Sequence, residues 1–397
     1  MSIHSSRGGA FGRIRSFVLA DHRYVLLATS AVACVGMWLS SCPRARLSFL
    51  LPVWELEVAM YWLMAAWVVV SAAGLVSKLL HWRDYAQVSP LARPAARRAL
   101  RIGSYLVWGC AAVVAADRLG AGLATAWQVA VSAPQRPDEP LTSILYMLCQ
   151  GRDTFLAGIG TTVALAVLGT VIAFFLALAL VFMRLQRPDR PDSDLVRFLK
   201  TFSSGFARLY STVVRGTPMM VQAMIVYYGV FGIFRDAGMS ATEVNAIWST
   251  FAAGLVTVSL NSAAYMMEVL RGGIESVDRG QAEAARSLGL SQWQAMRRVV
   301  FPQGVRNAIP GLSNELVINI KDSSVLSVIS VFDLMFATKT VAGIYYQQFQ
   351  AALIAAVAYL VLTMVATALL GRMARRLDVR PSMLLSTSDN AVRVQED

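Results

Sequence analysis

Two apolar stretches of the chain carry polar side chains at the helical spacing i, i+4 and i+7: Glu315, Asn319 and Asp322 in one, and Asn261, Tyr265 and Glu268 in the other. Residues at this spacing share one face of a helix. A carboxylate accepts hydrogen bonds from an ammonium or guanidinium group, while an amide both donates and accepts. The two faces could therefore bind a small polar molecule.

The position of these groups along the helices predicts how deep they lie in a membrane. At a rise of about 1.5 Å per residue, Glu315 and Asn261 each lie about 15 Å from the cytoplasmic end of their span. That is the middle of a hydrocarbon core about 30 Å thick, where transporters hold their substrates. Glu268 would be only about 5 Å deep, which suits a gate or an ion pair with Arg271.

Each of these residues also has a purely structural interpretation. Glu315, Asn319 and Asn261 could form hydrogen bonds between helices, and Lys321 could pair with Asp322 or Glu315. In the functional interpretation, Glu315 meets a substrate ammonium or guanidinium, and Lys321 or helix-end amides meet its carboxylate. Gln222 is a weaker candidate for the lining of the same pathway.

The composition shows what must position these side chains. The chain has 397 residues, of which 56% are hydrophobic and 15% charged, and its mean hydropathy is +0.54. Soluble domains are about one quarter charged, so we expect an all-α integral membrane protein. Runs long enough to span the bilayer predict about eight helices, at 24–40, 59–80, 104–131, 155–183, 207–234, 246–270, 305–334 and 349–370. The third is the weakest, because Asp117 and Arg118 interrupt it.

Charge placement predicts the orientation. The net charge is +12, and the basic residues cluster in the N-terminal segment, in the second, fourth and sixth connections and in the tail. The positive-inside rule then places both termini in the cytoplasm. Because the clusters are short and lie between apolar runs, they do not indicate binding to nucleic acid. No grouping of cysteine and histidine predicts a metal site, and no cofactor is expected.

A polar, proline-bearing linker at 132–154 suggests a boundary. We expect a three-span extension at 1–150, a five-span core at 151–380 and a cytoplasmic tail at 381–397.

The sixth connection, 278–302, contains two helix-start signals. Asp278 followed by Gln281, and Ser291 followed by Gln294, have capping-box spacing, and Gly289 between them suits the end of a helix. The pattern predicts two short helices that meet at a glycine elbow, and Pro302 marks the approach to the next span. Helices this short need a surface to dock against, which could be a partner protein or the chain's own membrane face.

This segment resembles the EAA loop of the permease subunits of ATP-binding cassette (ABC) importers. The matching residues are Glu283, Ala284, Ala285, Gly289, Val299 and Pro302. Three longer stretches, Val213–Phe231, Asn261–Leu290 and Asn319–Leu334, resemble the branch that takes up polar amino acids (His, Glu, Gln, Arg, opines), with Ser323 where Thr is usual. The resemblance covers about 155–377. Some general L-amino-acid permeases have extra N-terminal spans, but 1–150 has no motif that ties it to them.

The resemblance implies a type I importer fold in the bacterial inner membrane, in which the chain is not itself an enzyme. Glu283, Ala284, Ala285, Gly289 and Pro302 would then belong to the segment that docks on a separate ATPase subunit. A second permease subunit, identical or homologous, and an extracytoplasmic amino-acid-binding protein would complete the importer. Independently, none of the four lysines follows a glycine, so the chain lacks a P-loop for ATP.

Two other functions fit parts of the sequence. A secondary transporter driven by protons through Glu268, Glu315 and Asp322 would need no ATPase, but it would have no use for a docking elbow. A scaffold subunit that only assembles a complex would need no polar pathway.

Overall fold

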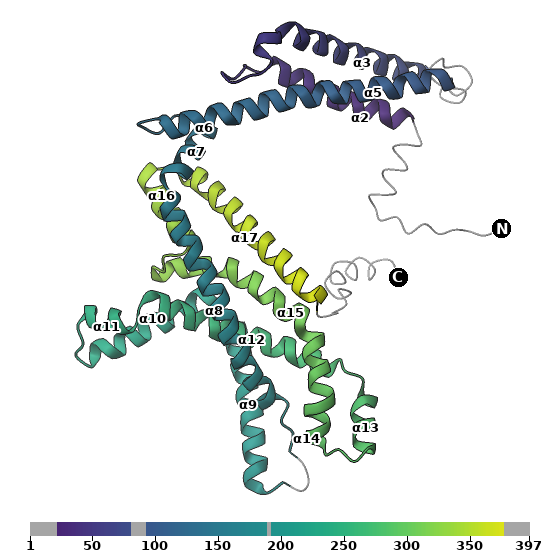
Figure 1. The fold of residues 1–397 in the computed structure, drawn as a ribbon. Coiled ribbons are helices and arrows are strands. Elements are labelled where there is room, and N and C mark those ends of the chain that lie inside the picture. The colour runs from purple at the N-terminus through teal and green to yellow at the C-terminus, as the bar shows by residue number, and fades with distance from the viewer. Residues whose placement is uncertain (1–21, 81–92, 189–191, 377–397) are drawn as a thin grey trace, which may run out of the picture. The chain divides into compact units, whose positions relative to one another are not determined.

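A computed structural model describes residues 22–80, 93–188 and 192–376, and every regular element in these ranges is helical, as predicted (Figure 1). The chain divides into two compact units, Met1–Tyr146 and Met147–Asp397. The predicted tail at 381–397 and the start of the predicted extension lie outside the described residues.

The first unit consists of a helical hairpin and one long helix. Helices α2 (His22–Ser41) and α3 (Trp54–Leu80) pack against α5 (Pro94–Ala115). Helix α5 continues through a π-helical segment (Ala116–Ala121) into α6 (Gly122–Ser132), and α7 (Pro140–Gln150) follows. The buried core between α2, α3 and α5 contains Ala33, Met64, Trp67, Val107 and Ala111.

The charges that interrupt the third predicted span do not break it. Asp117 and Arg118 lie in the π-helical segment, where both are buried. Arg118 forms ion pairs with Asp117 and with the buried Glu57 of α3. Asp117 also accepts hydrogen bonds from the Ser48 hydroxyl and the Leu50 N–H, at 2.8–3.2 Å. The helix therefore continues because Asp117 and Arg118 pair with each other and with polar groups that pack beside them.

The second unit is built around α8 (Arg152–Arg184) and α12 (Thr250–Glu275), which pack against each other. The remaining helices are α9 (Asp194–Gly216), α10 (Met219–Asp236), α11 (Ala241–Ile247), α13 (Arg279–Ser287), α14 (Gln292–Ala295), α15 (Phe301–Asp322), α16 (Leu334–Tyr345) and α17 (Gln348–Arg376). At the crossing of α12 and α15, a Cβ on Gly304 would lie 2.7 Å from the Ile274 backbone, so only glycine permits this approach.

The prediction of eight simple spans is not confirmed. Five helices in the described residues are long and apolar enough to cross a membrane, and two further spans count only if each is a bent pair of helices. The apolar part of α2 is shorter, Ala28–Ser41.

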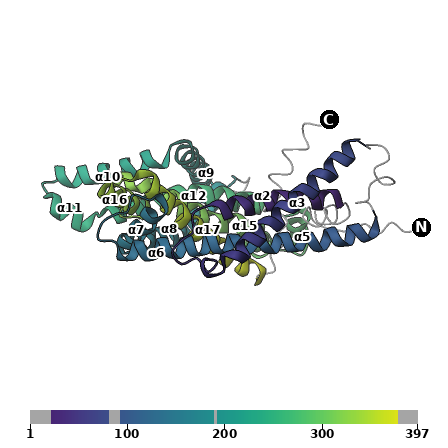
Figure 2. The ribbon, with the colours of Figure 1, turned by 90° about the horizontal axis from the view of Figure 1, so that it is seen from above.

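The fifth and seventh predicted spans were wrong in shape. The stretch 207–234 bends by 108° between α9 and α10, because Pro218 forces Thr217 into an extended conformation that a helix cannot accommodate. The stretch 305–334 leaves the α-helix at Asp322, forms a 3-10 segment (Ser323–Ile329) and bends by 55° before α16. Figures 1 and 2 both show α10 and α11 extending to one side of the second unit as a result.

Candidate functional site

A polar cavity of about 360 Å³ lies in the second unit, where α12, α15 and the α9–α10 bend meet. Its lining residues are Thr217, Pro218, Met219, Asn261, Ser262, Tyr265, Glu315, Ile318, Asn319 and Asp322. Four of the seven expected pathway residues therefore face one space: Glu315, Asn319, Asn261 and Asp322. The broken helix completes the wall that a continuous span could not supply.

The two asparagines of the cavity are held by hydrogen bonds between helices. Asn319 accepts from the Ser262 hydroxyl at 2.6 Å and donates to Thr170 of α8 at 2.8 Å. Asn261 donates to the side-chain oxygen of Gln222 on α10 at 3.0 Å. The interhelical hydrogen bonds expected in the structural interpretation are thus formed, and they fix the orientation of both amides. Gln222 itself supports Asn261 from behind and does not line the cavity.

The carboxylates of the cavity have a different environment. Glu315 is 7% exposed, and neither it nor Asp322 forms a hydrogen bond or ion pair with any residue that the structure describes. Lys321 is exposed and does not line the cavity. Neither of its expected ion pairs, with Asp322 or Glu315, is formed among the described residues. The cavity therefore contains two acidic groups and no basic one among its lining residues.

Glu268 lies outside the cavity and forms the expected ion pair with Arg271, at 2.8 Å. Arg271 also pairs with Glu275 at 2.6 Å, and Glu268 accepts a hydrogen bond from Ser211 of α9 at 3.2 Å. This group links α9 to the end of α12 and has no role in the lining of the cavity.

Sequence reasoning missed several members of the cavity. Ser262, Ile318 and the start of α10 were not expected there. Arg215 lies 5.4 Å from the Tyr265 ring centre, a cation–π contact that holds this basic side chain beside the bend. The X-Pro dipeptide at 217–218 was the available signal for a break at this point.

The elbow at 278–302 is the second candidate site, and its first half is fixed by hydrogen bonds at both ends. Asp278 caps α13 through the Gly280 N–H at 2.6 Å, and not through the expected capping box with Gln281. At the other end the Leu290 N–H bonds to Ala285 and the Gly289 N–H to Arg286, at 3.2 and 2.9 Å. This is a Schellman motif, and Gly289 has the required φ of +88°.

The second half of the elbow begins with the predicted capping box, but it does not form a separate short helix. Ser291 and Gln294 form the expected capping box. Helix α14 then runs without a break through a π-helical segment (Met296–Val300) into α15, so the second short helix was wrong as a separate element. Pro302 has no N–H and so donates no backbone hydrogen bond in the helix. At the residue before it, the Phe301 N–H donates to the carbonyl of Met296, five residues back, which is the π-helical pattern.

The elbow presents only part of its motif to the surroundings. Glu283, Ala284, Gly289 and Pro302 are exposed, but Ala285 is buried at 5% exposure against its own chain. Ala285 therefore differs from the expectation of a surface residue, because α13 packs on its own chain through that side. Leu288, which sequence reasoning did not single out, is 85% exposed at the tip.

Comparisons with known proteins show what the chain is similar to. Residues 193–379 match the family model described as binding-protein-dependent transport system inner membrane component. The nopaline transport system permease protein NocM of Agrobacterium fabrum is 30% identical over 57% of this chain and 88% of its own length. The glutamine transport system permease protein GlnP of Escherichia coli K12 is 33% identical over 47% of this chain and 82% of its own. Among solved structures, a chain titled as an amino acid ABC transporter with histidines aligns with 58% of this chain and 96% of that chain, with 32% identity and a TM-score of 0.49.

Proposed function

Because the chain belongs to the family of binding-protein-dependent transport system inner membrane components, we propose that it is the permease subunit of an ABC importer for polar L-amino acids. In this proposal residues 151–380 are the transporting core and residues 1–150 are an extension. Family membership favours this function over a secondary transporter that works without an ATPase.

The cavity beside Glu315 is proposed to be this subunit's share of the pathway. Glu315 and Asp322 would accept hydrogen bonds from the substrate ammonium, since both line the cavity without partners among the described residues. Helix α10 begins at the cavity, and Pro218 and Met219 contribute to its wall. The start of a helix leaves backbone N–H groups free and carries a partial positive charge, which suits the substrate carboxylate. Lys321 is not proposed to bind the substrate carboxylate, because it does not line the cavity.

The elbow is proposed to couple this subunit to an ATPase subunit. The observation that carries the coupling proposal is Leu288, which is 85% exposed on a tip held by a Schellman motif and a capping box. A large apolar side chain on a rigid tip is suited to enter a pocket of another protein. Glu283 and Ala284 would contact the same partner beside it, and the buried Ala285 would position α13 from within.

The remaining partners follow from the family. The subunit would pair with a second permease, receive its substrate from an extracytoplasmic binding protein and lie in the bacterial inner membrane with both termini in the cytoplasm.

Co-purification with the ATPase tests the coupling proposal. We expect Leu288→Asp to lose the ATPase subunit from the purified complex, because a charge would have to enter an apolar pocket. Arg297→Gln, on an exposed side chain of the π-helical segment after α14, is the control and should retain it. Normal co-purification and normal uptake by the Leu288→Asp variant would refute the docking role of the elbow.

A further inference from the structure

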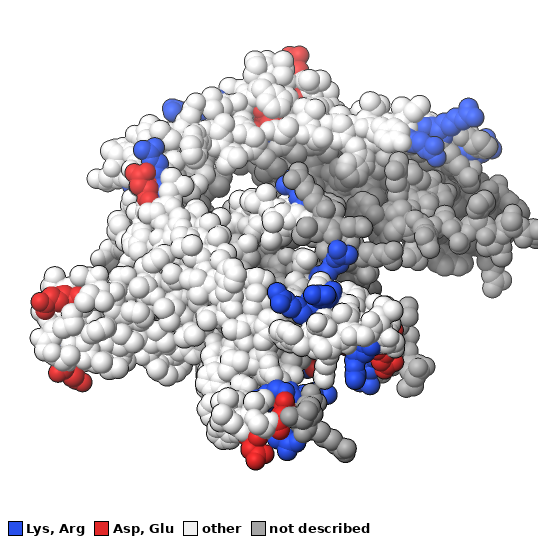
Figure 3. Space-filling model, turned by 60° about the horizontal axis from the view of Figure 1, so that its bottom comes forward, with Lys and Arg blue, Asp and Glu red and all other residues white. Residues whose placement is uncertain are grey.

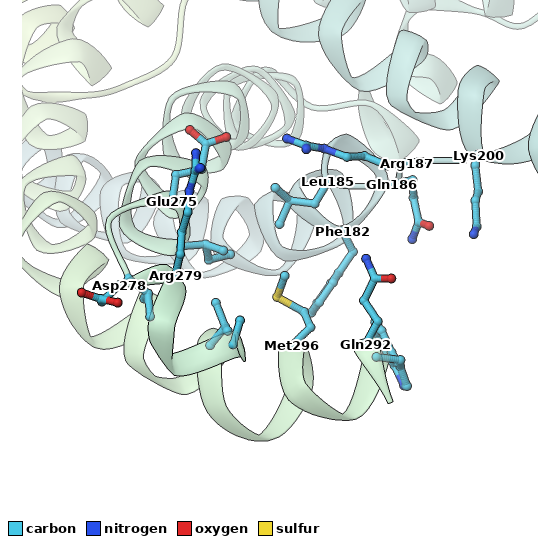
Figure 4. Close-up of a pocket in the computed structure, with 15 residues that line it drawn as sticks. Phe182, Leu185, Gln186, Arg187, Lys200, Glu275, Asp278, Arg279, Gln292 and Met296 are labelled. Carbon is cyan, nitrogen blue, oxygen red and sulfur yellow. The ribbon is translucent and has the colours of Figure 1, made fainter. Parts of the chain in front are cut away.

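The end of the second unit that carries the elbow holds a larger cavity, of about 800 Å³, which the transport pathway does not use (Figure 4). Its walls come from the end of α8, the start of α9, the end of α12, and α13 with α14. The floor is apolar and includes Phe182, Ile274, Met296 and Val300. Phe182 also packs against Phe301 and Trp293, with ring centres 5.0 and 6.3 Å apart.

The rim of this cavity has unbalanced positive charge. Of its charged members, Lys200 is paired with Asp192 at 2.6 Å, and Glu275 is paired with Arg271. Asp278 caps α13. Arg187 and Arg279 form no ion pair or hydrogen bond with any residue in the described ranges. Figure 4 shows these two side chains reaching from different walls toward the same side of the cavity, with Glu275 beside Arg279.

The neighbouring surface of α9 shows at what depth the cavity lies. Leu195, Phe198 and Phe202 are 68%, 63% and 63% exposed, on a helix whose Lys200 faces the cavity. Apolar side chains so exposed on a membrane protein are suited to contact lipid, which would place this part of α9 at the edge of the hydrocarbon. Figure 3 shows that most of the visible surface is uncharged and that the charged side chains occupy a few clusters. Trp293, 56% exposed, adds an interfacial aromatic residue at the cavity mouth.

We propose that this cavity binds the phosphate head group of an anionic phospholipid, with its acyl chains on the apolar floor. Arg187 and Arg279 supply positive charge and N–H donors for the negatively charged phosphate, and basic pockets between helices at the cytoplasmic face are suited to such head groups. A bound lipid would touch α13 and α14 directly, so it would brace the elbow against the membrane. The site does not depend on the substrate or on the ATPase.

Quenching of Trp293 fluorescence by brominated lipids tests the proposal on the full-length chain in vesicles. The signal of Trp293 is the difference between the wild type and Trp293→Phe. We expect dibrominated phosphatidylglycerol to quench it at a much lower mole fraction than dibrominated phosphatidylcholine. The double variant Arg187→Gln/Arg279→Gln should reduce that preference about 25-fold, or about five-fold for each basic side chain at the membrane surface.

The matched control is Arg297→Gln/Arg298→Gln, which removes two exposed arginines next to the cavity that do not line it. It should keep the wild-type preference. Equal quenching by the two lipids in the wild type would overturn the proposal, as would an unchanged preference in the Arg187/Arg279 variant. Millimolar inorganic phosphate should not reverse the quenching; reversal would assign the cavity to a soluble anion instead of a lipid.

Discussion

In the first unit, Arg118 lies between Glu57 and Asp117, whereas in the second unit Glu315 and Asp322 line a cavity that has no basic side chain in its wall. Both groups occupy apolar helices, where an uncompensated charge is costly. In the first group both carboxylates have partners besides Arg118: Arg44 adds a second base on Glu57, and Ser48 and the Leu50 N–H donate hydrogen bonds to Asp117. In the second group, neither Glu315 nor Asp322 has a basic partner among the residues that line the cavity.

The difference separates a structural role from a binding role. Charges that satisfy one another need no further partner, so the group around Arg118 holds the first unit together. Carboxylates that face a cavity without a basic side chain are suited to bind a cationic group of a substrate reversibly. Removal of a charge should therefore damage the first group's stability and the second group's function.

The largest effect on stability is expected for Arg118→Met. This change leaves Glu57 and Asp117 buried without their shared base, and breaking a buried ion pair from one side costs about 3–5 kcal/mol. Thermal unfolding in detergent should show a large loss for this variant. Arg152→Gln, which breaks only the exposed pair with Asp153, should change little. Comparable unfolding of the two variants would mean that the Arg118 group is not a structural element.

A smaller loss is expected for Asn319→Ala. Asn319 is 2% exposed and connects the buried Ser262 to the half-buried Thr170, so its removal leaves both hydroxyl groups without this partner. The cost of such unsatisfied groups is about 1–3 kcal/mol. Double-mutant cycles with Thr170→Val would measure the coupling, and strictly additive effects would contradict the hydrogen bond.

Two glycines that both have free space for a side chain should respond differently to substitution by alanine. A Cβ would meet nothing within 4 Å at Gly289 or at Gly272, but only Gly289 has a positive φ. The left-handed conformation costs a residue with a side chain about 1–2 kcal/mol. Gly289→Ala should therefore loosen the elbow, seen as faster amide exchange across 279–295, while Gly272→Ala should leave this exchange unchanged. Equal exchange in the two variants would show that the turn does not depend on glycine.

The smallest effect on stability is expected for Glu315→Gln. Since the Glu315 side chain forms no hydrogen bond or ion pair among the described residues, loss of its charge breaks no such contact and should leave the unfolding temperature near that of the wild type. A loss as large as that of Arg118→Met would instead give Glu315 a structural role and remove the contrast between the two units.

Local signals in the sequence predicted much of the elbow's local structure, although the capping box expected at Asp278 did not form. The capping box at Ser291 and the left-handed Gly289 were confirmed, because both depend on residues within one turn. The bend at Thr217–Pro218 was missed, since the apolar run continues across it and span prediction weighed composition over the X-Pro signal. The pairing of Arg118 with Glu57 joins residues far apart in the chain, which only the packing of α3 against the π-helical segment reveals.

The role of Glu315 in transport can be tested in the assembled importer that carries Glu315→Gln in this subunit. The measurement compares amino-acid uptake into vesicles with ATP hydrolysis by the same preparation. Uptake should be lost while hydrolysis continues, because the cavity loses a carboxylate proposed to hold the substrate while the elbow is unchanged. Uptake equal to that of the wild type would contradict this role and would exclude Glu315 from the pathway.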